Sequence, residues 1–146
     1  MTLSFRFLDE IALADCAFEA RGDTPSELCA AAARAVIETM ANPSTVRPVL
    51  TKQLAHDGDS LSGVLFDWLS DLVYLKDAES LMFHEAICTV STDPSENTWA
   101  LDGTVTGERI DPSRHELRAD VKAVTKHRYS VRQEAQGWTA TVVMDI

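Results

Sequence analysis

Apolar and polar residues alternate one by one in segment after segment of this chain. Successive side chains of a β-strand point to opposite faces of a sheet, so this period of two predicts strands with one apolar and one largely polar face. Strands of this kind are typical of an antiparallel sheet that is covered on one side. The alternating segments are residues 3–8, 15–21, 85–90, 99–105, 116–123, 129–132 and 138–145.

Two stretches follow a helical period instead. Thr24 is placed as the N-cap of the first helix, with Glu27 completing a capping box, and apolar residues then recur at helical spacing until Asn42. The second helix follows Gly-Asp-Ser, which repeats the Gly-Asp-Thr of the first, so Ser60 is its predicted N-cap. Two helices packed on a mainly antiparallel, multi-stranded sheet make an α+β fold, and we expect one domain over residues 1–146.

The formal net charge of −10 narrows the classes of partner. An acidic surface repels phosphate backbones, so direct nucleic-acid binding is disfavoured unless a local basic patch exists, whereas a cation or a basic protein suits it. No apolar run approaches the 18 residues of a membrane span, and the charged first residues do not read as a secretory signal. Three cysteines without paired spacing indicate free thiols, and we expect a cytoplasmic protein.

The letters Gly-Asp-Ser-Leu around Ser60 also begin the nucleophile motif of a large family of lipases and esterases. A nucleophilic serine needs a base and a group that orients the base. The nearest candidates, Asp111 and His115, have one residue too many between them for that family's Asp-x-x-His pattern, and the parallel βα alternation is missing. The sequence therefore favours a helix cap, with an esterase as the weakest of the functions considered.

Two aspartates lie at the ends of predicted strands. Asp15 begins the second strand, and Asp145 ends the last one, next to the carboxylate of Ile146. If these ends meet, three carboxylates converge, and a hard cation such as Ca²⁺, Mg²⁺ or Mn²⁺ would offset their repulsion. Frayed termini are the competing interpretation.

Charges of alternating sign mark one predicted strand, where Glu116, Arg118, Asp120 and Lys122 share the polar face. From periodicity alone, a solvated face with weak same-face pairs is the favoured interpretation. A contact surface for a partner is the functional alternative.

Read together, these segments resemble the archease family over nearly the whole chain. The most specific piece is the run from His115 to His127, followed at the end of the chain by Asp145 and Ile146. The other matching pieces are residues 5–9, 14–24, 57–61 and 66–75. The resemblance implies a non-catalytic activator that promotes guanylylation and turnover of the GTP-dependent RNA ligase of tRNA splicing and RNA repair. A chaperone-like module acting on another protein is the alternative.

The resemblance also implies site residues. Asp15, Asp145 and the Ile146 carboxylate match the family's divalent-cation ligands, often for calcium, while Asp120 and Lys122 match polar residues of its charged strand. One departure stands at the first hairpin, which is two residues longer than usual in the family and lacks its histidine. Asp9 keeps the Phe-Leu-Asp context of the family's first aspartate and is expected as an additional acidic contact, with a direction that the insertion alters. The implied partner is the ligase, without sequence-specific nucleic-acid contacts and without a membrane.

Overall fold

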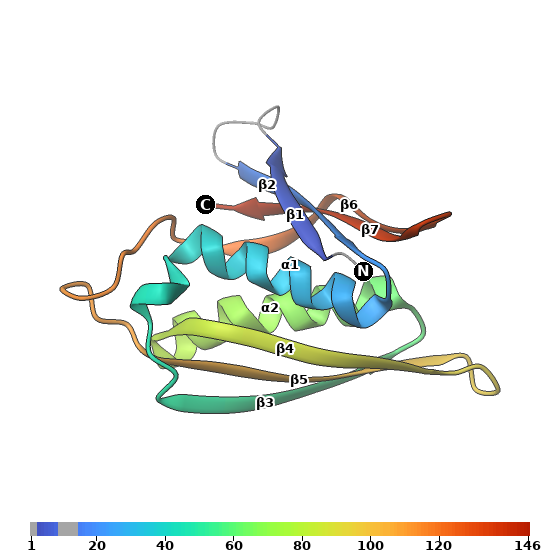
Figure 1. The fold of residues 1–146 in the computed structure, drawn as a ribbon, viewed down its shortest axis with the longest axis horizontal. Coiled ribbons are helices and arrows are strands. Elements are labelled where there is room, and N and C mark those ends of the chain that lie inside the picture. Colours follow the sequence, from blue (N-terminus) through green and yellow to red (C-terminus); the bar gives the residue numbers. More distant parts are fainter. Residues whose placement is uncertain (1–2, 9–14) are drawn as a thin grey trace.

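Seven strands and two long helices make up the part of the chain that the computed structural model describes, residues 3–8 and 15–146 (Figure 1). In chain order they are β1 (Ser4–Leu8), β2 (Asp15–Gly22), α1 (Pro25–Met40), the short 3₁₀ helix η1 (Pro43–Thr45), β3 (Leu50–Gly58), α2 (Leu61–Glu79), β4 (Leu81–Asp93), β5 (Thr98–Arg109), β6 (Ala123–Glu134) and β7 (Gly137–Asp145). No helix within these residues is long and apolar enough to cross a bilayer.

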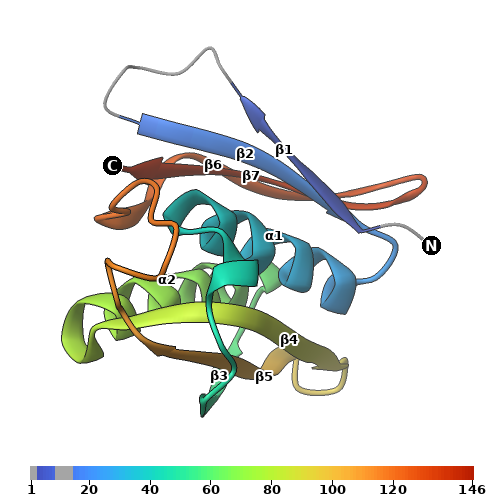
Figure 2. The ribbon, with the colours of Figure 1, turned by 60° about the vertical axis from the view of Figure 1, so that its left-hand side comes forward.

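The strands form two antiparallel sheets, one in the order β1-β2-β7-β6 and the other in the order β3-β5-β4. Both helices lie in a layer between the sheets, as the second view shows (Figure 2). The predicted α+β class, with two helices on antiparallel strands, is confirmed. The division into two sheets is new information, because a strand alternates in the same way whichever sheet it joins.

Both helix starts agree with the sequence. Thr24 caps α1: its side chain accepts the Glu27 amide (3.1 Å), and the Glu27 carboxylate accepts the Thr24 amide (3.1 Å), which is a complete capping box. Ser60 caps α2 by accepting the Gly63 amide at 3.0 Å.

The core fills the helix layer, with Trp68 of α2 as its largest fully buried side chain. Its ring nitrogen donates to the Cys29 carbonyl of α1 (3.1 Å), which satisfies the one polar atom of the indole. On the other side the ring lies against Gly103 of β5, where an added Cβ would come within 2.3 Å of it. Trp68 therefore ties α1, α2 and the three-stranded sheet together.

The predicted strand over residues 116–123 is wrong. Before β6 begins, these residues belong to a linking segment (residues 110–122) that joins β5 to β6 and forms only an isolated bridge, between Leu117 and Ala41. Its amides are used elsewhere: those of Arg118 and Ala119 donate to carbonyls in the last turn of α1, at 2.8 and 3.0 Å. The alternation of apolar and polar residues therefore reflects an extended segment that crosses the end of α1, and not a strand of a sheet.

Strand β3 is the element that the alternation does not predict. Its inward positions include Lys52 and His56 beside Leu54, so its inner face does not look apolar. Both polar side chains instead reach carboxylates of α2: Lys52 pairs with Glu79 (2.7 Å) and His56 with Asp71.

Candidate functional site

The start of β2 and the end of β7 meet at one edge of the four-stranded sheet. Asp15 is the direct register partner of Asp145, and Asp145 also faces Ala123 at the start of β6. The Lys122 amide donates to the Asp145 carbonyl at 2.8 Å. We call Asp15, Asp145 and the neighbouring Ile146 the carboxylate rim. The end of the linking segment lies beside this rim.

The two aspartates point to the same side of the sheet. Their neighbours Cys16 and Met144 pack on the core, and alternation then directs Asp15 and Asp145 to the outer face. Directly opposed residues of an antiparallel pair have Cα atoms about 4.5–5.5 Å apart, so the carboxylates are close enough to share one cation. The Ile146 side chain packs on the core and holds the end of the chain at the rim.

The rim provides two acidic side chains, those of Asp15 and Asp145. Within residues 3–8 and 15–146, no three His, Cys, Asp or Glu side chains converge into a metal-binding group. A cation here would complete its six to eight oxygen ligands with backbone carbonyls and water, which calcium accepts readily. Asp9, the additional contact considered from the sequence, lies outside the described residues.

Asp120 is paired, which the sequence does not predict. Lys76, in the last turn of α2, donates to Asp120 at 2.5 Å and to Asp77 at 2.7 Å, and its side chain is 7% exposed. The Lys76 hydrogen bond holds the pKa of Asp120 below its ordinary value. A lysine one turn after the buried Leu72, on the apolar side of a helix, is the signal that could have revealed this pair.

Two other charged residues of the linking segment stabilise the end of α1. Arg118 donates to the Glu38 carbonyl (2.8 Å) and forms ion pairs with Glu38 (3.3 Å) and Glu116 (3.1 Å). A guanidinium at a helix C-terminus also complements the helix dipole. Glu116 and Arg118 therefore have a structural role, while the Lys122 side chain is exposed and forms no ion pair among the described residues.

The buried His115 is bound in a polar network. Its Nε2 lies 2.9 Å from Glu108, while its Nδ1 accepts the Asp111 amide (3.0 Å), which fixes the neutral tautomer with the proton on Nε2. Arg114 (2.6 Å), His115 and the Arg47 amide (2.7 Å) together hold the pKa of Glu108 far below its usual range. His115 is thus oriented by Glu108 and the Asp111 backbone. It is far from the role of a catalytic base for Ser60, which caps α2 as predicted.

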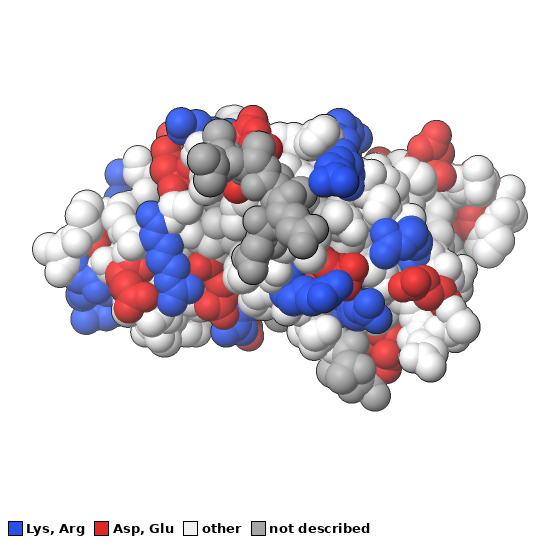
Figure 3. All heavy atoms as spheres, turned by 90° about the horizontal axis from the view of Figure 1, so that it is seen from above, with Lys and Arg blue, Asp and Glu red and all other residues white. Residues whose placement is uncertain are grey.

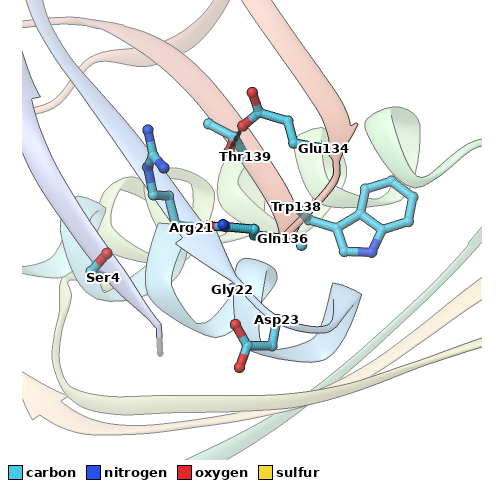
Figure 4. Close-up of a pocket in the computed structure, with 9 residues that line it drawn as sticks. Ser4, Arg21, Gly22, Asp23, Glu134, Gln136, Trp138 and Thr139 are labelled. Carbon is cyan, nitrogen blue, oxygen red and sulfur yellow. Dashed lines mark hydrogen bonds between the residues drawn. The ribbon is translucent and has the colours of Figure 1, made fainter. Parts of the chain in front are cut away.

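A small hollow lies at the opposite end of the same sheet (Figure 4). It is lined by Arg21, Glu134, Trp138, Thr139 and their neighbours, where Gly22 pairs with Trp138 in register. Arg21 is bound to Glu19 at 3.2 Å, and Glu134 accepts the Thr139 hydroxyl at 2.5 Å. These polar groups already satisfy one another, so the carboxylate rim remains the better candidate.

The comparisons with known proteins identify the family of the chain. The model of the Archease protein family (MTH1598/TM1083) matches residues 5–146. The chain belongs to the archease family. The protein archease of Methanopyrus kandleri is 32% identical over 133 residues, which cover 91% of this chain and 94% of that protein.

Two solved archease-family structures share the fold. The solution structure of Methanobacterium thermoautotrophicum protein 1598 is 30% identical with a TM-score of 0.80, covering 97% of this chain and 98% of that one. A crystal structure from Thermotoga maritima, described as an archease and possible chaperone, is 16% identical with a TM-score of 0.61 and the same coverage, and its likeness concerns the fold. The resemblance seen in the sequence is therefore confirmed.

Proposed function

We propose that this archease-family chain is a protein activator of a GTP-dependent RNA ligase, promoting guanylylation of the ligase and its repeated turnover. The observation that carries the proposal is the carboxylate rim, where Asp15 and Asp145 are register partners and the Lys122 amide is bound to Asp145. Residues far apart in the sequence thus share one surface with the linking segment. A shared surface of this kind suits a protein that acts by contact.

The same proposal assigns a divalent cation to the rim, calcium first and Mg²⁺ or Mn²⁺ as alternatives. Asp15, Asp145 and the Ile146 carboxylate would hold it. A bound cation offsets the repulsion between these carboxylates and fixes the ends of β2 and β7 relative to each other. Lys122 and Asp120, which lie beside the rim on the linking segment, are assigned to contact with the ligase.

The test mixes the chain with the RNA ligase of the same organism and labelled GTP. We expect more guanylylated ligase per unit time and several rounds of RNA joining per ligase molecule in its presence. Labelled GTP followed on the denatured ligase measures the first step, and joined RNA per ligase measures turnover. Unchanged guanylylation and turnover at saturating chain would overturn the proposal.

A chaperone-like function is the second candidate, supported by the description of the Thermotoga maritima structure as a possible chaperone. The two functions differ in what they require. A chaperone would suppress aggregation of heated ligase in the absence of GTP, whereas an activator would raise guanylylation of fully folded ligase. Measuring light scattering and guanylylation on the same ligase preparation separates them.

A further inference from the structure

The cations of this acidic chain fall into two groups. Seven of its 13 lysines and arginines form an ion pair with a carboxylate among the described residues. The six others, which form none within residues 3–8 and 15–146, are Arg47, Arg109, Lys122, Lys126, Arg128 and Arg132. A cation that no carboxylate of the described residues holds in an ion pair is more readily available to a partner.

Four of these six cations lie in or just before β6. We call Lys122, Lys126, Arg128 and Arg132 the β6 cation strip. Residues 121–133 contain no aspartate or glutamate, although the chain has 23 of them. All four side chains are exposed. The strip is therefore basic along its length on a molecule with a net charge of −10. Two carboxylates flank its ends, Asp120 beside Lys122 and Glu134 beside Arg132.

The strip lies on an edge that is open to a partner. Among the strands of residues 3–8 and 15–146, β6 is the last of its sheet and pairs with β7 alone. The Lys126 ammonium is held 4.0 Å from the centre of the Phe66 ring, so its position is partly fixed before any ligand arrives. Arg128 has a φ of 55° at an irregularity in the pairing between Thr125 and Ser130, which breaks the regular strand at this point.

Charge is distributed differently on the two sheets. On the outer side of the four-stranded sheet, lysine and arginine side chains are interspersed with acidic ones (Figure 3). On the three-stranded sheet, alternation directs Asp57, Glu85 and Asp102 outward, with no lysine or arginine at the outward positions. A polyanion is therefore repelled from one side of the molecule and has cations available on the other.

We propose that the β6 cation strip binds the phosphate backbone of single-stranded RNA. The choice of RNA rests on the proposed function, since the substrate of an RNA ligase is the polyanion that its activator would meet. An acidic peptide adding a strand to β6 is disfavoured because the irregularity between Thr125 and Ser130 interrupts the row of backbone groups that such a strand needs. A nucleic-acid backbone is bound through its phosphate charges and needs no continuous row of backbone hydrogen bonds.

The test measures fluorescence anisotropy of a short labelled oligouridylate with the protein alone, without ligase. We expect weak binding whose affinity falls with salt, with a log–log slope of about −2 to −3, since each of three or four phosphates contributes about −0.7. The double variant Arg128→Asn/Arg132→Gln should bind roughly tenfold more weakly and reduce the slope by about 1.4. Asparagine is chosen at position 128 because it tolerates a positive φ.

The matched control is Arg47→Gln/Arg109→Gln, which removes the two remaining unpaired cations and changes the net charge equally. This control should bind like the wild type. Absence of RNA binding, or equal weakening in both double variants, would overturn the proposal. So would binding of polyglutamate with the same dependence on Arg128 and Arg132, because the strip would then serve an acidic protein. Activation of the ligase is measured in a separate assay. If the chain fails to activate the ligase, the RNA-binding measurement still tests the β6 cation strip.

Discussion

Ser60 is a polar side chain whose role is set by the amide that it accepts. Ser60 accepts the Gly63 amide as a helix cap. Ser60→Asp should keep the fold and its stability, because aspartate caps about as well, while Ser60→Ala should lose about 0.5–2 kcal/mol in the free energy of unfolding, measured with denaturant. Esterase activity in the wild type that disappears in both variants would contradict this assignment.

Glu108 makes stability depend on acid pH. Its folded-state pKa is lowered, chiefly by Arg114, so its contribution is complete above the ordinary carboxyl pKa and is lost as pH falls toward the folded value. Between about pH 4.3 and pH 2, unfolding free energy should therefore fall less steeply for Glu108→Gln than for the wild type. The control Glu96→Gln, in the exposed turn between β4 and β5, should keep the wild-type slope; equal slopes in all three proteins would refute the role of Glu108.

At the scale of elements, the sequence predicted what local patterns encode. The caps at Thr24 and Ser60 were predictable because capping depends on residues within one helical turn. The linking segment was not, because its amides bind carbonyls of α1 about 80 residues earlier, which alternation cannot reveal. The sequence did not predict β3, because Lys52 and His56 lie on its inward face. These polar side chains can face inward there because each pairs with a carboxylate of α2.

Lys122 tests whether the linking segment contacts a partner. The structural contact of this residue is its backbone amide, so Lys122→Ala should keep the unfolding free energy within about 0.5 kcal/mol. Guanylylation of the ligase should fall, while the control Arg109→Ala, another exposed and unpaired cation, should leave it unchanged. Full activation of the ligase by well-folded Lys122→Ala would show that Lys122 is a solvated surface residue without a contact to the ligase.

For the molecule as a whole, the sequence offered the meeting of Asp15 and Asp145 only as a condition, because it places both residues at strand ends without showing which strands pair. The pairing of β2 with β7 was required to bring them together, and pairing across more than 100 residues is a tertiary fact. The Lys76–Asp120 pair likewise depends on α2 lying beneath the linking segment, which follows from both helices lying between the sheets.

Cation binding at the rim should appear as a gain in thermal stability. At about ten times its dissociation constant, Ca²⁺ adds about 1.4 kcal/mol to a state that alone binds it, and the melting temperature should rise by about 3–5 °C. Asp15→Asn should abolish the gain, and Asp102→Asn, on the outer side of the other sheet, should retain it. An equal rise in melting temperature in Asp15→Asn and the wild type would show that calcium binds elsewhere. No rise in the wild type would contradict the proposed cation site.

The central claim is tested most directly by the guanylylation rate of the RNA ligase in the presence of the wild type, of Asp145→Asn or of the charge-matched control Asp102→Asn. All three proteins are first shown to be folded, and labelled guanylate on the ligase is then followed with time. The rim account predicts that the wild type and Asp102→Asn accelerate guanylylation equally while Asp145→Asn fails to do so. Equal acceleration by a folded Asp145→Asn protein would contradict it.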